Sequence, residues 1–421
     1  MFKRLNTFIP WAAKQGIKQI EIIGANKSFI YSKTNRYVDM TSGLMVVNLG
    51  HNNKYIKHAF SNQLDTGLSY VPSSFGNYHR DKLSTRLLDV TQKKGKVFYG
   101  LGGADVNETA IFLSLEYHRI NGNNRSTVLT FEKSFHGGSS IVSSLIGGDS
   151  RKINKEQYFE LPLSRKIPNP TMEDDGDHSI STIIDIIKDG NVAGIMIEGS
   201  SGSAGCIHYP KGYLDKIQKI CTDNDVILIL DEVMSGWGRT GKLFGYNHSN
   251  INPDIITMAK GLTCGYSPLG ALVVDNKISD MYDTNRLNTG LTYYGHPISC
   301  SVANNCLDLY LDDNMKIIDD ANDLGIRVNK VCKHLMDKYT IITEFRTNGL
   351  LGCFEFKNDT ILQIVTQLFL DNGIFCYNKY NLLFIAPPLN IDIDLLFGTF
   401  RKMDLIFEEI ESKIELQLIN C

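Results

Sequence analysis

The sequence lacks any apolar run that approaches the roughly 20 residues needed for a membrane-spanning helix. It also lacks an excess of charge of either sign, because 43 lysines and arginines stand against 46 aspartates and glutamates, for a formal net charge of −3. A chain this close to neutral offers no broad electrostatic attraction to nucleic acid or to an anionic membrane. We therefore expect neither nucleic acid nor a membrane as a partner.

Paired cysteine motifs are missing as well. The nine cysteines occur singly, none has the C-x-x-C spacing of zinc or redox sites, and their number is odd. Reduced thiols in a cytoplasmic protein, with no metal site, are the simplest interpretation. The start of the chain carries Lys3, Arg4 and Lys14 but no continuous apolar core or small-residue cleavage site, so we expect no secretory signal. A transit peptide is the less favoured alternative, because this stretch is poor in serine.

The composition is that of a globular protein, with 43% hydrophobic and 21% charged side chains in 421 residues. Between about Leu44 and Asp275, short apolar runs alternate with helical stretches. Such runs between helices are typical of strands that are buried on both faces of a mostly parallel sheet. The clearest runs are Ala193–Ile197, Val226–Leu230, Ile255–Met258 and Ala271–Val274.

A looser mixture of helices and strands begins at about Ala321. We expect a helix to about Lys338, two strands between Ile341 and Phe356, a helix from Thr360, a strand at Leu382–Ala386 and a terminal helix from about Asp392. The chain is therefore predicted to be an α/β protein with a large domain at residues 45–315 and a smaller α+β domain built from residues 1–44 and 316–421. The acidic, proline-containing segment Asn154–His178 is predicted to be a long surface loop.

Three of the apolar runs lead directly into ionisable residues, which are Glu198, Asp231 and Lys260. In an open α/β sheet such positions meet at the carboxyl ends of the strands, where ligands bind. A buried carboxylate is costly unless a cation or hydrogen-bond donors meet it, and burial lowers the pKa of a lysine, which makes a neutral amine available. Taken alone, Asp231 could equally be a helix cap or part of a structural ion pair, and Lys260 could be an ordinary solvated lysine.

A glycine-rich turn supplies a candidate phosphate site. The segment Gly100-Leu101-Gly102-Gly103-Ala104 leads from a strand into a helix expected from Asp105 to about Arg119. Glycines free backbone N–H groups, and the start of a helix attracts anions. The turn could instead be a tight connection without a ligand, and its spacing is not the G-x-G-x-x-G of dinucleotide-binding proteins. Phe135 and His136, which follow a strand expected at Thr127–Phe131, are candidates to contact a flat cofactor.

Together these features resemble the class III aminotransferases, which are pyridoxal-phosphate (PLP) enzymes of fold type I. The resemblance extends from about Trp11 to Pro387-Pro388-Leu389. Its most specific part is an ordered set of motifs, namely Asp231-Glu232-Val233, Gly236-Trp237-Gly238-Arg239-Thr240-Gly241, Pro253-Asp254-Ile255 and Lys260-Gly261. Ser42-Gly43-Leu44 together with residues 46–51 is most similar to the branch that acts on ω-amino acids or taurine with pyruvate.

The resemblance implies a role for each matching residue. Lys260 would bind PLP as a Schiff base and then act as the general base, and Asp231 would pair with the pyridine nitrogen. Val233 and Phe135 would lie on the two faces of the ring.

Further contacts to the cofactor follow from the same resemblance. Gly103 and Ala104 would donate backbone N–H groups to the phosphate, with His136 and Glu198 completing the cofactor site. Thr292 corresponds to a threonine that reaches the phosphate of the partner subunit, which implies a homodimer with shared active sites.

The chain departs from the family where a substrate carboxylate is bound. Tyr377 stands at the usual position of an arginine, so Glu198 lacks that expected partner. Arg346 and Lys379 are candidate replacements for the arginine. Trp11 and Tyr377 are further candidates for contact with the substrate.

We therefore predict an aminotransferase that moves an amino group from an amine or ω-amino acid to a keto acid, with pyruvate favoured, in a ping-pong sequence. The alternative is other PLP chemistry on the same scaffold, such as that of an aminomutase, a racemase or a decarboxylation-coupled transaminase. A catalytically inactive binding protein is less favoured, because Lys260 and Asp231 are both present.

Overall fold

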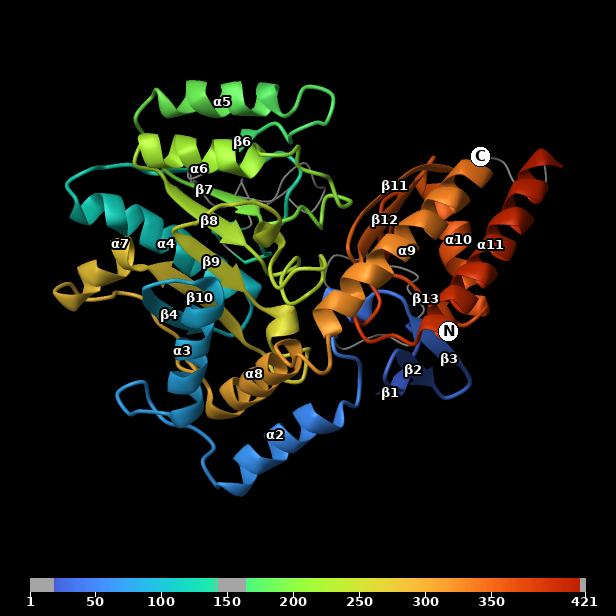
Figure 1. Ribbon diagram of the computed structural model, residues 1–421, viewed down its shortest axis with the longest axis horizontal. Helices are drawn as coiled ribbons and strands as arrows, with labels where there is room; N and C mark the ends of the chain where they lie inside the picture. Colours follow the sequence, from blue (N-terminus) through green and yellow to red (C-terminus); the bar gives the residue numbers. More distant parts are fainter. Residues whose placement is uncertain (1–18, 140, 143–163, 417–421) are drawn as a thin grey trace, which may run out of the picture.

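The computed structural model describes residues 19–139, 141–142 and 164–416. Its elements form two groups, one around a seven-stranded sheet and one that contains two four-stranded sheets (Figure 1). In the large sheet the strands lie in the order β4-β10-β9-β8-β7-β5-β6. Their bounds are β4 (Gly95–Gly100), β5 (Thr127–Phe131), β6 (Ser164–Ile167), β7 (Val192–Glu198), β8 (Ile227–Asp231), β9 (Ile255–Met258) and β10 (Gly270–Asp275).

The large sheet is parallel except at β10. This strand pairs antiparallel with both of its neighbours, β4 and β9, whereas β6, β5, β7, β8 and β9 pair parallel in turn. The predicted α/β architecture with a mostly parallel sheet is thus confirmed. Every residue of β7, β8 and β9 is buried, which explains why their sequences are nearly continuous apolar runs.

The helices cover both faces of this sheet. Because side chains alternate along a strand, Ile227 and Ile229 pack with α4, whereas Leu228 and Leu230 belong to the core that contains residues of α3, α5 and α6. The helices of this group are α2 (Lys54–Asp65), α3 (Tyr78–Thr91), α4 (Gly103–Ile120), α5 (Asp177–Ile187), α6 (Tyr213–Asp223), α7 (Asn276–Ser279) and α8 (Pro297–Tyr310). Short 3-10 turns are η3 (Gly245–His248), η4 (Lys260–Leu262) and η5 (Asp280–Asp283).

The second group joins segments from both ends of the described chain. Its first sheet has the order β1-β2-β3-β13, and β13 pairs parallel with β3; its second sheet has the order β11-β12-β15-β14. The strands are β1 (Ile22–Asn26), β2 (Phe29–Ser32), β3 (Arg36–Asp39), β11 (Ile342–Asn348), β12 (Leu351–Phe356), β13 (Ile374–Phe375), β14 (Asn378–Lys379) and β15 (Leu382–Ile385). The helices are α1 (Ser42–Met45), α9 (Ile317–Lys338), α10 (Asp359–Asp371) and α11 (Ile393–Glu415). The domain boundaries at residues 45 and 316 remain our proposal.

The segment predicted to be one long surface loop contains regular structure. The prediction for Asn154–His178 is wrong at β6 and at the start of α5, and its first ten residues, 154–163, lie outside the described residues. Of the four residues of β6, Ile167 alone is buried, because β6 is an edge strand with a single neighbour in the sheet. Such a strand carries neither an apolar run nor a regular alternation by which its sequence could reveal it.

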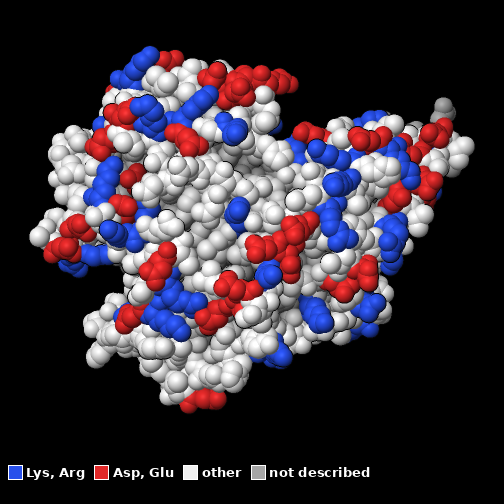
Figure 2. Space-filling model, in the orientation of Figure 1, with Lys and Arg blue, Asp and Glu red and all other residues white. Residues whose placement is uncertain are grey.

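Charged side chains of both signs are intermixed over the face shown in Figure 2. On this face, charge therefore offers no directed attraction to a polyanion. Among the described residues, no helix is long and apolar enough to cross a membrane. Within residues 19–139, 141–142 and 164–416, no three His, Cys, Asp or Glu side chains gather in a way that could hold a metal ion.

Candidate active site

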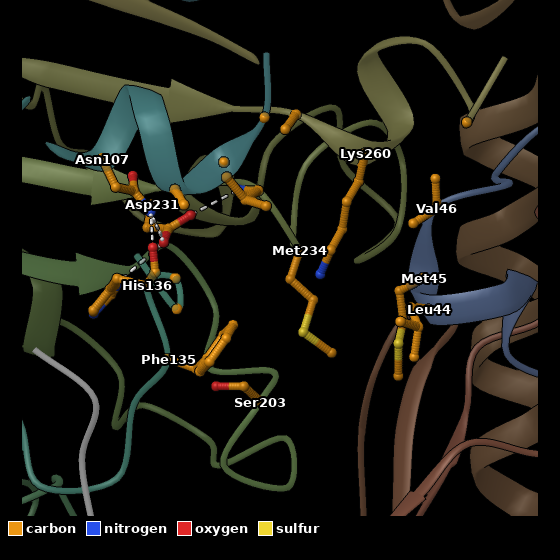
Figure 3. Close-up of a pocket in the computed structure, with 18 of the residues that line it drawn as sticks. Leu44, Met45, Val46, Asn107, Phe135, His136, Ser203, Asp231, Met234 and Lys260 are labelled. Carbon is orange, nitrogen blue, oxygen red and sulfur yellow. Dashed lines mark hydrogen bonds and ion pairs between the residues drawn. The ribbon is translucent and has the colours of Figure 1, made fainter. Parts of the chain in front are cut away.

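A pocket of about 630 Å³ opens at the carboxyl ends of β7, β8 and β9. Its volume lies within the usual range for small-molecule sites, about 300–1,000 Å³. The start of α4 contributes to the wall, and residues 44–46 and 377–384 of the second group close the opposite side. Figure 3 shows Lys260 between these walls, with Asp231 on one side and Leu44, Met45 and Val46 on the other.

Asp231 is the last residue of β8 and is only 4% exposed. One carboxylate oxygen, Oδ1, accepts a hydrogen bond from the backbone N–H of Val233 at 2.9 Å. The other, Oδ2, lies 2.8 Å from both Nδ2 of Asn107 and Nδ1 of His136. These three contacts hold the carboxylate of Asp231 in one orientation at the pocket, where it could pair with a protonated ring nitrogen.

His136 and Asn107 fix Asp231 from behind. Oγ1 of Thr130 lies 3.1 Å from Nε2 of His136, whose side chain is fully buried. Asn107 donates to the backbone oxygen of His136 at 2.7 Å and accepts from Thr257 at 2.6 Å, so its amide is bonded at both ends. His136 therefore acts on the site through Asp231, and not by stacking on a ring in the open pocket.

Lys260 begins the 3-10 turn η4, one residue after the end of β9. Its backbone has φ of 45°, a left-handed conformation that is uncommon for a side chain of this size. A Cβ on the next residue, Gly261, would lie 2.6 Å from Nδ2 of Asn48, so the tight turn requires glycine there. Burial lowers the pKa of the Lys260 ammonium, and the carboxylates of Asp231 and Glu198 oppose this shift. The turn thus presents an amine with increased neutral character to the pocket.

The glycine turn places the start of α4 against the pocket. Gly102 caps this 18-residue helix without a side-chain hydrogen bond, and residues 101–104 line the pocket. The first N–H groups of a helix have no partner within the helix, and the helix dipole makes this end positive. A Cβ at Gly103 would lie 2.9 Å from Cγ1 of Val233, so glycine is needed for this close packing. The turn fits the phosphate of a cofactor whose ring lies beside Val233.

Glu198 is satisfied by the loop that follows β7. Its Oε2 accepts from the N–H of Gly202 at 2.7 Å, and its Oε1 accepts from the hydroxyl of Ser203 at 2.8 Å. The N–H of Phe135 contributes a longer contact of 3.4 Å to Oε1. Donors from this loop therefore occupy Glu198, although the arginine expected of the family is replaced by Tyr377.

The structure brings together most, but not all, of the residues predicted for the site. Those that line the pocket are Gly103, Ala104, Phe135, His136, Glu198, Asp231, Val233, Lys260, Tyr377 and Lys379. Arg346 is not among the lining residues, because its guanidinium donates to the backbone oxygen of Gly205 at 2.6 Å and to Glu355 at 2.7 Å. Thr292 is exposed and also lies away from the pocket of its own chain, and Trp11 lies outside the described residues.

The lining residues that were not predicted include Asn107, Ser203 and Met234. The sequence does indicate a special position for Asn107. It precedes Ala110 by three residues and follows Gly103 by four, so it lies on the helix face that carries the apolar residues. A polar side chain on a buried helix face needs partners, and here these are Asp231 and Thr257. Ser203 and Met234 lie in irregular segments, where no periodic pattern points to a site.

Comparison with known proteins agrees with this geometry. Residues 17–407 match the sequence profile described as aminotransferase class-III. The chain belongs to this family. A class-III relative, the acetylornithine aminotransferase of Caldanaerobacter subterraneus, is 29% identical over 90% of this chain and 92% of its own. The omega-aminotransferase of Caulobacter vibrioides is 28% identical over 87% of this chain and 89% of its own.

Solved aminotransferase structures show the same fold. The taurine:2-oxoglutarate aminotransferase of Bifidobacterium kashiwanohense, in complex with PLP and glutamate, has a TM-score of 0.89 and 26% identity, with 96% of both chains covered. An amine transaminase from an uncultivated Pseudomonas species has a TM-score of 0.90 at 23% identity, over 97% of this chain and 99% of the other. This class-III aminotransferase therefore has the PLP-dependent fold type I, as predicted.

Proposed function

We propose that Lys260 binds PLP covalently, that Asp231 pairs with the ring nitrogen, and that the start of α4 binds the phosphate through Gly103 and Ala104. PLP is the cofactor of this enzyme family, and the aminotransferase matched over 96% of the chain contains it. One observation carries the assignment: an amine of lowered pKa, a buried carboxylate and a helix start without a side-chain cap line the same pocket. Val233 and Phe135 would hold the two faces of the ring, while His136 and Glu198 would support the site from behind.

Each residue of the site then has its own role in the proposed reaction. The bound cofactor withdraws electrons from the substrate carbon that loses its proton. Lys260, which would hold the cofactor covalently, would also take up that proton at Nζ and return it during the transfer. Asp231 holds a proton at the ring nitrogen through its negative charge, and His136 and Asn107 hold Asp231 in place. Apolar side chains of Leu44, Met45 and others in the pocket wall limit access of water.

For the substrates, we propose an amine or ω-amino acid donor and a keto-acid acceptor, with pyruvate as the favoured acceptor, in a ping-pong sequence. The support is the likeness to an omega-aminotransferase and to a taurine:2-oxoglutarate aminotransferase. Tyr377 in the pocket wall also favours donors without a second acidic group. An aminomutase, racemase or decarboxylation-coupled reaction on the same residues is the alternative.

The test is to give the purified protein PLP and follow its visible absorbance. We expect a band that borohydride removes, and its conversion by an amine donor should stop after one half-turnover unless a keto acid is added. A racemase or aminomutase would continue without a keto acid. Lys260→Ala should lose both the band and turnover while keeping its fold, whereas the exposed Lys357→Ala should keep both. Full activity in Lys260→Ala would overturn the assignment.

We also propose a homodimer in which Thr292 reaches the phosphate of the other subunit. Thr292 lies beside Tyr70, whose hydroxyl donates to the Thr292 backbone oxygen at 2.6 Å, and the Tyr70 ring contacts that of Tyr293. These residues belong to two neighbouring segments with many exposed apolar side chains, and large exposed apolar areas mark interaction surfaces. The side chains are Leu64, Leu68, Tyr70, Phe75, Tyr78, Leu287, Leu291 and Tyr293. For location we propose the cytoplasm, supported by the eight described cysteines, which are all free and buried.

A further inference from the structure

Lys260 has a backbone conformation that needs support from outside its own turn. Its φ is 45°, and Cys264, at the end of the same segment, has a φ of 50°. Side chains rarely adopt this left-handed conformation, which persists only where the surrounding structure enforces it. Within the segment, the N–H of Leu262 donates to the Ala259 oxygen at 2.9 Å. The N–H of Thr263 donates to the Lys260 oxygen at 3.2 Å. These bonds shape the turn, but they do not fix it relative to the other elements.

Helix α8 packs against this turn and supplies a hydrogen bond to it. The hydroxyl of Tyr310, the last residue of α8, donates to the backbone oxygen of Gly261 at 2.9 Å. Sγ of Cys264 lies 3.1 Å from that hydroxyl and makes a longer contact of 3.4 Å with the same backbone oxygen. Both side chains are buried, and burial raises the pKa of the Tyr310 phenol well above its ordinary value. The hydroxyl therefore keeps its proton and remains a donor to Gly261.

The ring of Tyr310 is itself held in place. It stacks on the indole of Trp237, with ring centroids 5.8 Å apart and an angle of 27° between the ring planes. Trp237 also packs against the turn, because a Cβ added at Gly261 would lie 2.8 Å from Cβ of Trp237. Gly261 is thus confined by Trp237 and hydrogen-bonded by Tyr310. The residue that follows Lys260 cannot shift without disturbing buried contacts, which is costly.

We propose that Tyr310 is a positioning residue, which holds the Lys260 turn through Gly261 so that Nζ of Lys260 points into the pocket as in Figure 3. This inference rests on the proposed function. Tyr310 does not line the pocket, so it acts on the site through Lys260. Without the Tyr310 hydroxyl, Lys260 is freer to leave its left-handed conformation, which turns its Cα–Cβ bond and displaces Nζ. Because a displacement of about 1 Å can slow a reaction about a hundredfold, one hydroxyl behind the turn affects proton transfer.

The first test measures the Lys260 amine in the apoprotein. Tyr310→Phe removes the hydroxyl and keeps the ring on Trp237. Tyr213→Phe is the matched control, because Tyr213 is also fully buried and its hydroxyl lies 2.6 Å from that of Ser179. Each apoprotein is trace-labelled with acetic anhydride over a range of pH, and mass spectrometry of the peptide that contains Lys260 gives the pKa of its amine. In Tyr310→Phe this pKa, which burial lowers in the wild type, should rise towards 10.5, because a loosened turn lets the amine reach water. Tyr213→Phe should match the wild type.

The second test uses the enzyme loaded with PLP. In a single turnover with an amine donor, Tyr310→Phe should transfer the proton about tenfold more slowly than the wild type. The half-saturating concentration of the donor should stay within about twofold, because Tyr310 does not line the pocket. Cys264→Ala removes the weaker donor to Gly261, so it should change the Lys260 pKa and the rate in the same direction but by less.

Urea unfolding establishes that each variant is folded. An unchanged pKa of Lys260 together with an unchanged rate in folded Tyr310→Phe, or equal changes in Tyr213→Phe, would refute the inference. If Tyr310→Phe does not fold, Cys264→Ala decides, and an unchanged Lys260 pKa in that variant overturns the inference. The labelling needs no cofactor, so it separates this inference from the proposed function. A wild-type protein that forms no borohydride-sensitive band with PLP would overturn the proposed function, while the labelling would still show whether Tyr310 holds the turn.

Discussion

At the scale of single residues, the site depends on a negative charge at Asp231. Asp231→Asn keeps the size of the side chain and an oxygen for the donors Asn107 and His136, but it removes the charge that holds a proton on the ring nitrogen. We expect the cofactor to remain bound covalently, while proton transfer slows by on the order of a hundredfold to a thousandfold, as when one preorganised electrostatic partner is lost. Single-turnover absorbance measures the rate, with the exposed Asp223→Asn as control. A rate near that of the wild type would show that Asp231 does not pair with the ring.

The lowered pKa of Lys260 predicts a pH-dependent cost in stability for the apoprotein. Since burial disfavours the charged form, the folded-state pKa lies below the unfolded value of 10.5. When the pH is below the folded-state pKa, Lys260 is protonated in both the folded and the unfolded state, and the cost of burying its charge is fully present. This cost disappears as the pH rises towards 10.5. Apoprotein with Lys260→Met should therefore resist urea better than the wild type at neutral pH, and this advantage should shrink at high pH. An advantage that stays constant with pH, or that also occurs in Lys357→Met, would contradict this reasoning.

The sequence identifies Lys260 and Asp231 because each ends an apolar strand and each lies in an ordered set of motifs. Asn107 and Ser203 are not identified in this way, because the partner Thr257 of Asn107 is distant in the chain and Ser203 lies in an irregular loop that turns back to Glu198. No local pattern encodes such a pairing. A side chain that reacts can thus be predicted from its own surroundings in the sequence, whereas one that holds it in place depends on tertiary contacts.

At the scale of elements, the same contrast applies to strands. The runs that became β7, β8 and β9 are buried on both faces and are readily predicted, but β6 has one neighbour and a single buried residue. Edge strands need little apolar surface, so composition does not distinguish β6 from a loop. The edge of the sheet is therefore the part of the fold that the sequence describes least well.

Arg239 connects elements of the two groups. Its guanidinium donates to the backbone oxygens of Leu350 and Pro387 and to the side chains of Ser42 and Asn48, and no carboxylate among the described residues forms an ion pair with it. Arg239→Met would remove a buried charge, which stabilises the fold, but it would also leave several buried acceptors unpaired, which destabilises it. We expect the destabilising effect to be the larger one. Stability should fall by about 2–5 kcal/mol, measured by urea unfolding of the apoprotein.

Loss of this connection should also affect the pocket. Residues 44–46 of its wall lie between Ser42 and Asn48, so loosening them should weaken substrate binding more than covalent attachment of the cofactor. Ser42→Ala removes one partner and should produce the same trend at smaller size without unfolding the protein. If Arg239→Met is as stable as the wild type and binds donors equally well, the arginine does not connect the two groups in any functional sense.

At the scale of the whole molecule, the proposed dimer makes each active site depend on two chains. If Thr292 serves the partner, a mixed dimer of one Lys260→Ala subunit and one Thr292→Val subunit contains one site with both native residues and one site with neither. Thr292→Val alone should weaken PLP binding about tenfold, the effect of one lost hydrogen bond to a charged group. Co-expressed and purified with two different tags, the mixed dimer should bind one PLP per dimer with native affinity and turn over at about half the wild-type rate per dimer. If Thr292 instead acts within its own chain, the lysine-containing site of the mixed dimer keeps the valine, and its PLP affinity stays as weak as that of Thr292→Val itself.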